Sequence, residues 1–92
     1  MSQNNKYFHN KPVLVCHLGC LPPAAEGIVE SIKCRRGVTC RLASLGVFPS
    51  QAVIVVRVTR RGAVLLKVNG MLLAVSAGVA ENIFVKEIPS AT

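Results

Sequence analysis

The sequence predicts a mainly β domain, folded as a small barrel of about five strands with one or two short helices. Residues that favour strands, above all valine and isoleucine, recur in short runs whose apolar side chains alternate with others. Tight turns containing glycine or asparagine separate these runs. Short strands joined by tight turns bury their apolar faces best when the sheet closes into a small barrel.

The chain has 92 residues and is therefore expected to form a single domain. Its apolar residues make up 51% of the total, with a mean hydropathy of +0.47. A small domain has little interior, so we expect part of this apolar surface to contact a partner or a second copy of the chain. The longest apolar runs, residues 53–56 and 71–75, are the length of strands and too short to span a bilayer.

Two segments are expected. Residues 1–17 are polar and aperiodic, which predicts a flexible N-terminal arm, and residues 18–88 form the domain. The apolar stretch before Cys20 is interrupted by His17 and is too short for a signal sequence, so the predicted location is the cytoplasm. Near the start of the domain, Pro22-Pro23 excludes regular structure. A strand over residues 27–32 and a turn over residues 34–37 follow.

A single clear helix is predicted over residues 39–45. Thr39 can cap its first turn through the hydroxyl group, and Gly46 suits the left-handed conformation that ends many helices. Pro49 prevents the helix from resuming.

The remaining elements are strands and one helical turn. In the strand over residues 52–60, the predicted dry face carries Ala52, Ile54, Val56 and Val58, and the other face carries Val53, Val55, Arg57 and Thr59. The next strand continues the dry face with Val64, Leu66 and Val68. Asn69-Gly70 predicts a type I′ hairpin turn into a strand over residues 71–75. Ser76 then caps a helical turn that ends at Ala80, and the last strand covers residues 83–88.

Residues 18–85 resemble the FeoA domain family. The resemblance rests on an ordered set of motifs: Leu18, Leu21, Pro22 and Gly27-Ile28-Val29; then Arg41-Leu42-Ala43-Ser44-Leu45-Gly46 followed by Pro49; then Leu73-Ala74, Ala80 and Ile83-Phe84-Val85. Ser50 departs from the pattern, because the family usually has glycine after this proline, and the conformation of that turn stays open.

This resemblance implies an SH3-like barrel and an accessory role in ferrous iron uptake. The implied partner is FeoB, the membrane permease with a cytosolic GTPase domain, which would bring the protein to the cytosolic side of the inner membrane. The family assigns no catalytic residues. A homo-oligomer also remains open.

The residues themselves argue against an enzyme. The two histidines, His9 and His17, both lie in the predicted arm, where no rigid frame would orient a base. The chain contains no aspartate, and its four glutamates are scattered. A phosphate-binding Gly-x-x-x-x-Gly-Lys-Ser/Thr loop is also missing, so GTP binding is expected to belong to another chain.

Four thiols raise the question of a metal site. Cys16, Cys20, Cys34 and Cys40 supply the number of ligands that tetrahedral zinc needs, and His17 is a spare ligand. Neither pair has the Cys-x2-Cys spacing of structural zinc sites. The alternatives are therefore a site for zinc or iron(II), which would make the chain a stand-alone metal-binding module, and unpaired cysteines that pack as small apolar residues.

The net charge of +7 predicts an acidic partner. Arg57, Arg60, Arg61 and Lys67 are expected to cluster on one hairpin, as a partner-binding patch or as a solvated edge that discourages strand pairing. Nucleic acid is the alternative partner of a small basic barrel. Aromatic residues make up only 4% of the chain, which leaves few platforms on which bases could stack.

Overall fold

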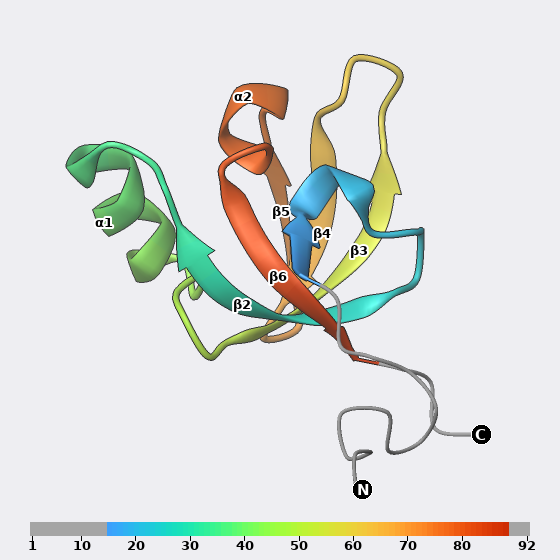
Figure 1. The fold of residues 1–92 in the computed structure, drawn as a ribbon, viewed down its shortest axis with the longest axis horizontal. Helices are drawn as coiled ribbons and strands as arrows, with labels where there is room; N and C mark the ends of the chain where they lie inside the picture. Colours follow the sequence, from blue (N-terminus) through green and yellow to red (C-terminus); the bar gives the residue numbers. More distant parts are fainter. Residues whose placement is uncertain (1–14, 89–92) are drawn as a thin grey trace, which may run out of the picture.

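One antiparallel sheet organises residues 15–88, the part of the chain that the computed structural model describes (Figure 1). Its elements follow one another as β1 (Val15–His17), the 3-10 helix η2 (Leu18–Cys20), β2 (Glu26–Ile32), α1 (Arg36–Ser44), β3 (Ala52–Val58), β4 (Val64–Val68), β5 (Met71–Val75), α2 (Ala77–Ala80) and β6 (Ile83–Ile88). The predicted mainly β fold is confirmed, with six strands in the described residues instead of about five.

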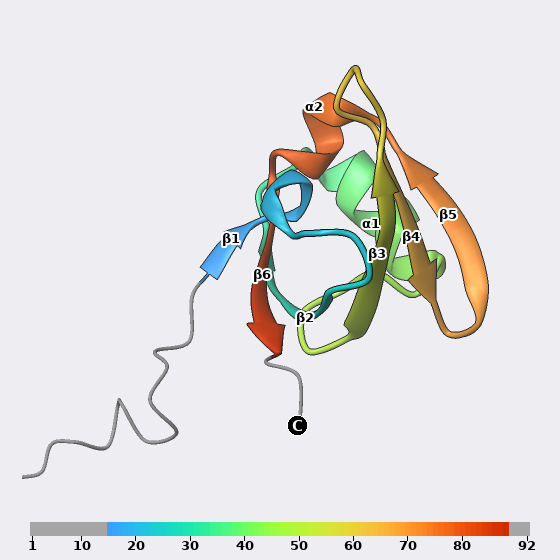
Figure 2. The ribbon, with the colours of Figure 1, turned by 90° about the vertical axis from the view of Figure 1, so that its right-hand side faces the viewer.

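The strand order in the sheet is β1-β6-β2-β3-β4-β5, so β1 and β5 are the two edge strands. The sheet curls strongly, so that β1 and β6 lie on one side of the barrel and β5 on the other (Figure 2). η2 and α2 contact each other at one end of the barrel, and α1 lies beside the end of β2 (Figures 1 and 2).

Strand β1 is the additional strand, and it lies in a segment that the sequence assigned to the arm. Residues 1–14 of that predicted arm lie outside the described residues. Val15–His17 pair with β6, with Cys16 opposite Val85. Cys16 is half-buried against the core, so strand structure that packs on the core is present before Leu18.

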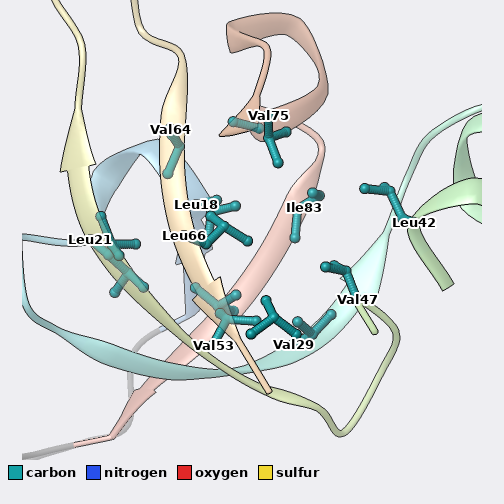
Figure 3. Close-up of a cluster of buried hydrophobic side chains, with 14 residues drawn as sticks. Leu18, Leu21, Val29, Leu42, Val47, Val53, Val64, Leu66, Val75 and Ile83 are labelled. Carbon is teal, nitrogen blue, oxygen red and sulfur yellow. The ribbon is translucent and has the colours of Figure 1, made fainter. Parts of the chain in front are cut away.

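The core is aliphatic and draws on every element of the described chain except β1 (Figure 3). Its buried residues are Leu18, Leu21, Val29, Leu42, Val47, Val53, Val55, Val64, Leu66, Val68, Val75, Ala80, Ile83 and Val85. Within residues 15–88, no polar or charged residue is buried. The polar side chains of residues 15–88 are therefore at least partly exposed to solvent.

The predicted dry face of β3 is wrong. Val53 and Val55 are buried at 1% and 0% exposure, whereas Val56 is 39% exposed. The register against β4 shifts between Val55 and Arg57, so Val56 is the extra residue of a β-bulge. A one-residue shift exchanges the two faces of a strand. Alternation counted through the bulge therefore placed Val53 and Val55 on the outer side and Val56 on the core side, the reverse of what the structure has. The predicted dry face of β4 is confirmed, since Val64, Leu66 and Val68 are all buried.

Helix α1 begins three residues earlier than predicted, at Arg36, and Arg35 is its N-cap without a side-chain hydrogen bond. Arg36 and Gly37, predicted as part of a turn, are its first helical residues. Thr39 lies inside the helix, and its hydroxyl donates to the Cys34 carbonyl oxygen at 3.2 Å instead of capping the first turn. The predicted end is confirmed by Gly46, whose φ is +99°.

The predicted hairpin turn and the predicted cap of the second helix are both confirmed. Asn69 and Gly70 both have positive φ, +51° and +80°, as the predicted hairpin turn requires. Ser76 caps α2, because its hydroxyl oxygen accepts a hydrogen bond from the Val79 N–H at 3.4 Å. None of the helices within residues 15–88 is long and apolar enough to cross a membrane.

Candidate functional site

The four cations predicted to bind a partner lie on the β3–β4 hairpin, and all four are exposed. Arg57 is in β3 opposite Leu65, and Lys67 is in β4 two residues further on. Paired residues in an antiparallel sheet share a face, so Arg57 and Lys67 lie on the same side of the hairpin. Arg60 and Arg61 lie in the turn at its tip, which protrudes from the barrel (Figure 1).

The β3–β4 hairpin itself carries no acidic residue, and the acidic residue in the same cross-strand row as Lys67 is Glu26 of β2, which pairs with Ile54, the partner of Lys67. Residues 51–76 contain four basic residues and no aspartate or glutamate. Within residues 15–88, the ion pair found is Lys86–Glu30, with 3.3 Å between Nζ and Oε1, on β6 and β2. Arg57, Lys67 and the two turn arginines thus make no ion pair with the described residues.

Apolar side chains lie beside the cations. The alternation of β4 and β5 places Leu65 and Lys67 opposite Ala74 and Leu72, on the side away from buried Val64 and Leu66. Leu72 is 64% exposed and Ala74 is also exposed. We call this side the outer face and define it by Arg57, Leu65, Lys67, Leu72 and Ala74. Its cations were predictable from the sequence but its leucines were not, because strand alternation alone does not show that β5 is an edge strand.

A second basic group lies at the start of α1, on another part of the surface. Arg35, Arg36 and Arg41 are exposed there, and Arg35 and Arg41 line a shallow groove with Gly37 and Val38. This group has three cations where the hairpin has four, and it lies on a different element from exposed Leu72, so it offers a comparison.

The structure does not assemble the predicted four-thiol site. Cys16 and Cys20 lie in β1 and η2, whereas Cys34 precedes α1 and Cys40 lies within it. Across residues 15–88, no group of three or more histidine, cysteine or acidic side chains is placed to hold a metal ion. All four cysteines are free thiols. Desolvation by burial raises the pKa of the Cys16 thiol above its ordinary value, and the charges of Cys20 and Glu87 raise it further.

His17, the predicted spare metal ligand, contacts the side chain of Cys20. His17 Nε2 lies 3.1 Å from Cys20 Sγ, and His17 Nδ1 accepts a hydrogen bond from the Gly19 N–H at 3.2 Å. His17 belongs to β1 and caps η2, so it is held by the ordered domain. The spacing of three residues between histidine and cysteine was the signal available in the sequence. His9, the other histidine, lies outside the described residues.

The curled antiparallel sheet, its aliphatic core and its two short helices define an SH3-like small barrel. A family model described as the FeoA domain matches residues 16–87. The chain therefore belongs to the FeoA domain family, a small domain associated with iron transport and not a known enzyme family.

Solved structures agree with this assignment. An iron uptake regulatory protein, FeoA, is 25% identical over 82% of this chain and 99% of its own, with a TM-score of 0.72. The FeoA protein from Chlorobium tepidum is 27% identical over 83% of this chain and 73% of its own, with a TM-score of 0.74.

A third structure shares the fold and is described as an SH3 domain protein. It is FeoA from Stenotrophomonas maltophilia, solved in complex with zinc, which is 24% identical over 75% of this chain and 87% of its own, with a TM-score of 0.63. No curated protein sequence matches the chain significantly.

Proposed function

We propose that this protein is an accessory protein of ferrous iron uptake that acts by docking to the cytosolic part of a FeoB-type permease. Membership of the FeoA family supports a role in ferrous iron transport. The observation that supports docking, and suggests the surface for it, is the outer face, where cations that make no ion pair with the described residues lie beside exposed Leu72.

The chemistry of this surface favours an acidic protein partner with some apolar character. Arg57 and Lys67 repel each other when no anion is near, and an acidic partner would offset that repulsion. Burial of Leu72, which is 64% exposed, would add apolar area to the contact. Charge of this kind mainly raises the rate of association, and salt weakens its effect.

The test is capture of FeoB from detergent-solubilised membranes by the tagged protein carrying Arg57→Glu and Arg60→Glu. We expect capture at low salt to fall by about tenfold, since both rate and affinity depend on these charges, and the deficit to shrink as salt rises. The melting temperature should hardly change, because exposed substitutions shift stability by less than about 0.5 kcal/mol.

The matched control carries Arg35→Glu and Arg36→Glu at the start of α1. Both double variants reverse two arginines and so change the net charge by the same amount, but the control leaves the hairpin intact. Glutamate at a helix N-terminus is favourable, so the control should also fold. Equal loss of capture in the two variants would show that only net charge matters, and no loss in the hairpin variant at any salt would exclude this surface.

Nucleic acid is the other partner that the cations favour. Counterion release would give the logarithm of the binding constant a slope of about −0.9 per phosphate neutralised on duplex DNA. Submicromolar binding to random oligonucleotides at physiological salt, together with normal iron uptake in a deletion strain, would replace the transport proposal with this one.

A further inference from the structure

We propose that Cys20 is a nucleophilic thiol, activated by His17, at which the protein undergoes reversible thiol–disulfide exchange with small disulfides. The pair brings a cysteine sulfur within hydrogen-bond reach of an imidazole nitrogen whose ring is oriented by a backbone N–H. Cys20 Sγ lies 3.1 Å from His17 Nε2, and the Cys20 side chain is exposed to solvent.

The backbone of η2 sets the tautomer of His17. The Gly19 N–H donates to Nδ1 at 3.2 Å, so the lone pair of Nδ1 is occupied and the proton of the neutral ring must lie on Nε2. That proton points toward the Cys20 sulfur. An N–H donor at this position stabilises the thiolate, which is the reactive form of cysteine.

The same hydrogen bond argues against a metal at this histidine. A metal bound to Nε2 would need its lone pair while Nδ1 still accepts from Gly19, so the ring would have to lose both protons. Histidine ligands in metal sites instead donate the proton of their second nitrogen to an acceptor. The geometry at His17 therefore favours nucleophilic chemistry over coordination.

The pair is held by the core. Leu18, between the two residues, is fully buried, and the Leu21 N–H donates to the Leu18 carbonyl oxygen at 3.3 Å to close η2. Glycine at position 19 leaves room for the imidazole. A Cβ atom there would lie 3.2 Å from His17 Cε1 and 3.4 Å from Nδ1.

The proposed reaction forms one S–S bond for each S–S bond that it breaks, so it needs no further oxidant. The Cys20 thiolate attacks one sulfur of a small disulfide, a new S–S bond forms on Cys20, and the old S–S bond breaks. The departing thiolate takes a proton from water. Cys16, the nearest other thiol in sequence, is half-buried and its pKa is raised by that burial, so it is slow to attack the mixed disulfide. The mixed disulfide should persist until an added thiol reduces it.

The test measures how fast oxidised glutathione modifies each cysteine of the reduced full-length protein at pH 7, by quenching and peptide mass mapping. Cys40 is an internal reference, because it is exposed and has no histidine contact among the described residues. Cys40 lies between Arg36 and Arg41 on the same helix, so it is a stringent reference. We expect Cys20 to react at least about fivefold faster than Cys40.

Two variants separate activation from exposure. In His17→Asn the amide oxygen can still cap η2, but no donor reaches the sulfur, so Cys20 should slow to the rate of Cys40. Gly19→Ala keeps both side chains and displaces the imidazole, so it should also slow Cys20. The Cys40 rate should be unchanged in both variants, which confirms that the fold is intact. Equal Cys20 and Cys40 rates in the unaltered protein, or an unchanged Cys20 rate in His17→Asn, would overturn the proposal.

Discussion

Ser50 is a residue in a conformation that its side chain does not favour. Its φ is +84°, in the left-handed region where residues with a Cβ atom are strained by about 1 kcal/mol or more. The position is fixed by a backbone hydrogen bond, in which the Ser50 N–H donates to the Val29 carbonyl oxygen at 2.8 Å. The turn that the sequence left open is therefore left-handed at Ser50.

Replacing Ser50 with glycine should stabilise the protein. Relief of the strain exceeds the extra entropy of glycine in the unfolded chain, so we expect the free energy of unfolding to rise by about 0.5 kcal/mol. Chemical denaturation measures this change. The matched control is Ser44→Gly in α1, where the same substitution should lower the free energy of unfolding by about 0.5 kcal/mol or more. A decrease in stability for Ser50→Gly would show that the turn relaxes without strain.

Strand β3 shows at the scale of an element what alternation alone cannot predict. The bulge at Val56 exchanges the faces of the strand, and its cause is the pairing with β4, which is a tertiary contact. By contrast, the Asn69-Gly70 turn, the end of α1 at Gly46 and the Ser76 cap were predictable, because each depends on the backbone preferences of one or two residues. The start of α1 was not predictable, since Thr39, the expected cap, lies inside the helix and its hydroxyl bonds to the carbonyl of Cys34, which precedes the helix.

The candidate sites follow the same division. The sequence predicted the hairpin cations because they lie close together along the chain. It did not predict the exposure of Leu72 on the outer face, which depends on the position of β5 in the sheet. The contact between His17 and Cys20 was not predicted either, because it depends on the turn of η2.

A pair of neighbouring valines in β3 tests the bulge. Val55→Ala should lower the free energy of unfolding by about 2 kcal/mol, because Val55 is 0% exposed and its methyl groups would leave a cavity. Val56→Ala should cost less than about 1 kcal/mol, because Val56 is 39% exposed. Denaturant unfolding of the two variants gives the comparison. Equal costs, or a larger cost at Val56, would contradict the register of β3.

At the scale of the whole molecule, positive charge and an apolar sheet edge have opposite effects on association between copies of the chain. The net charge of +7 keeps copies of the chain apart, whereas β5 has an unpaired edge within the described sheet. Edge strands are usually protected by charged residues, proline or a bulge. β5, with the sequence Met71-Leu72-Leu73-Ala74-Val75, has none of these.

Association should therefore increase with salt. At 1 M salt the Debye length falls to about 3 Å, so repulsion between copies is screened while the apolar attraction remains. Leu72→Lys should suppress this association, as measured by static light scattering across a salt series. Ser44→Lys adds the same charge away from the edge and should suppress it much less. If both lysines act alike, net charge and not the β5 edge controls association.

The edge of β5 also has a consequence for the lifetime of the protein at high concentration. A strand that can gain a neighbour without any unfolding offers a template for ordered stacking, and short apolar segments without proline are typical of fibril cores. Storage time in concentrated samples would then be limited by growth at this edge, even at temperatures where the barrel itself stays folded.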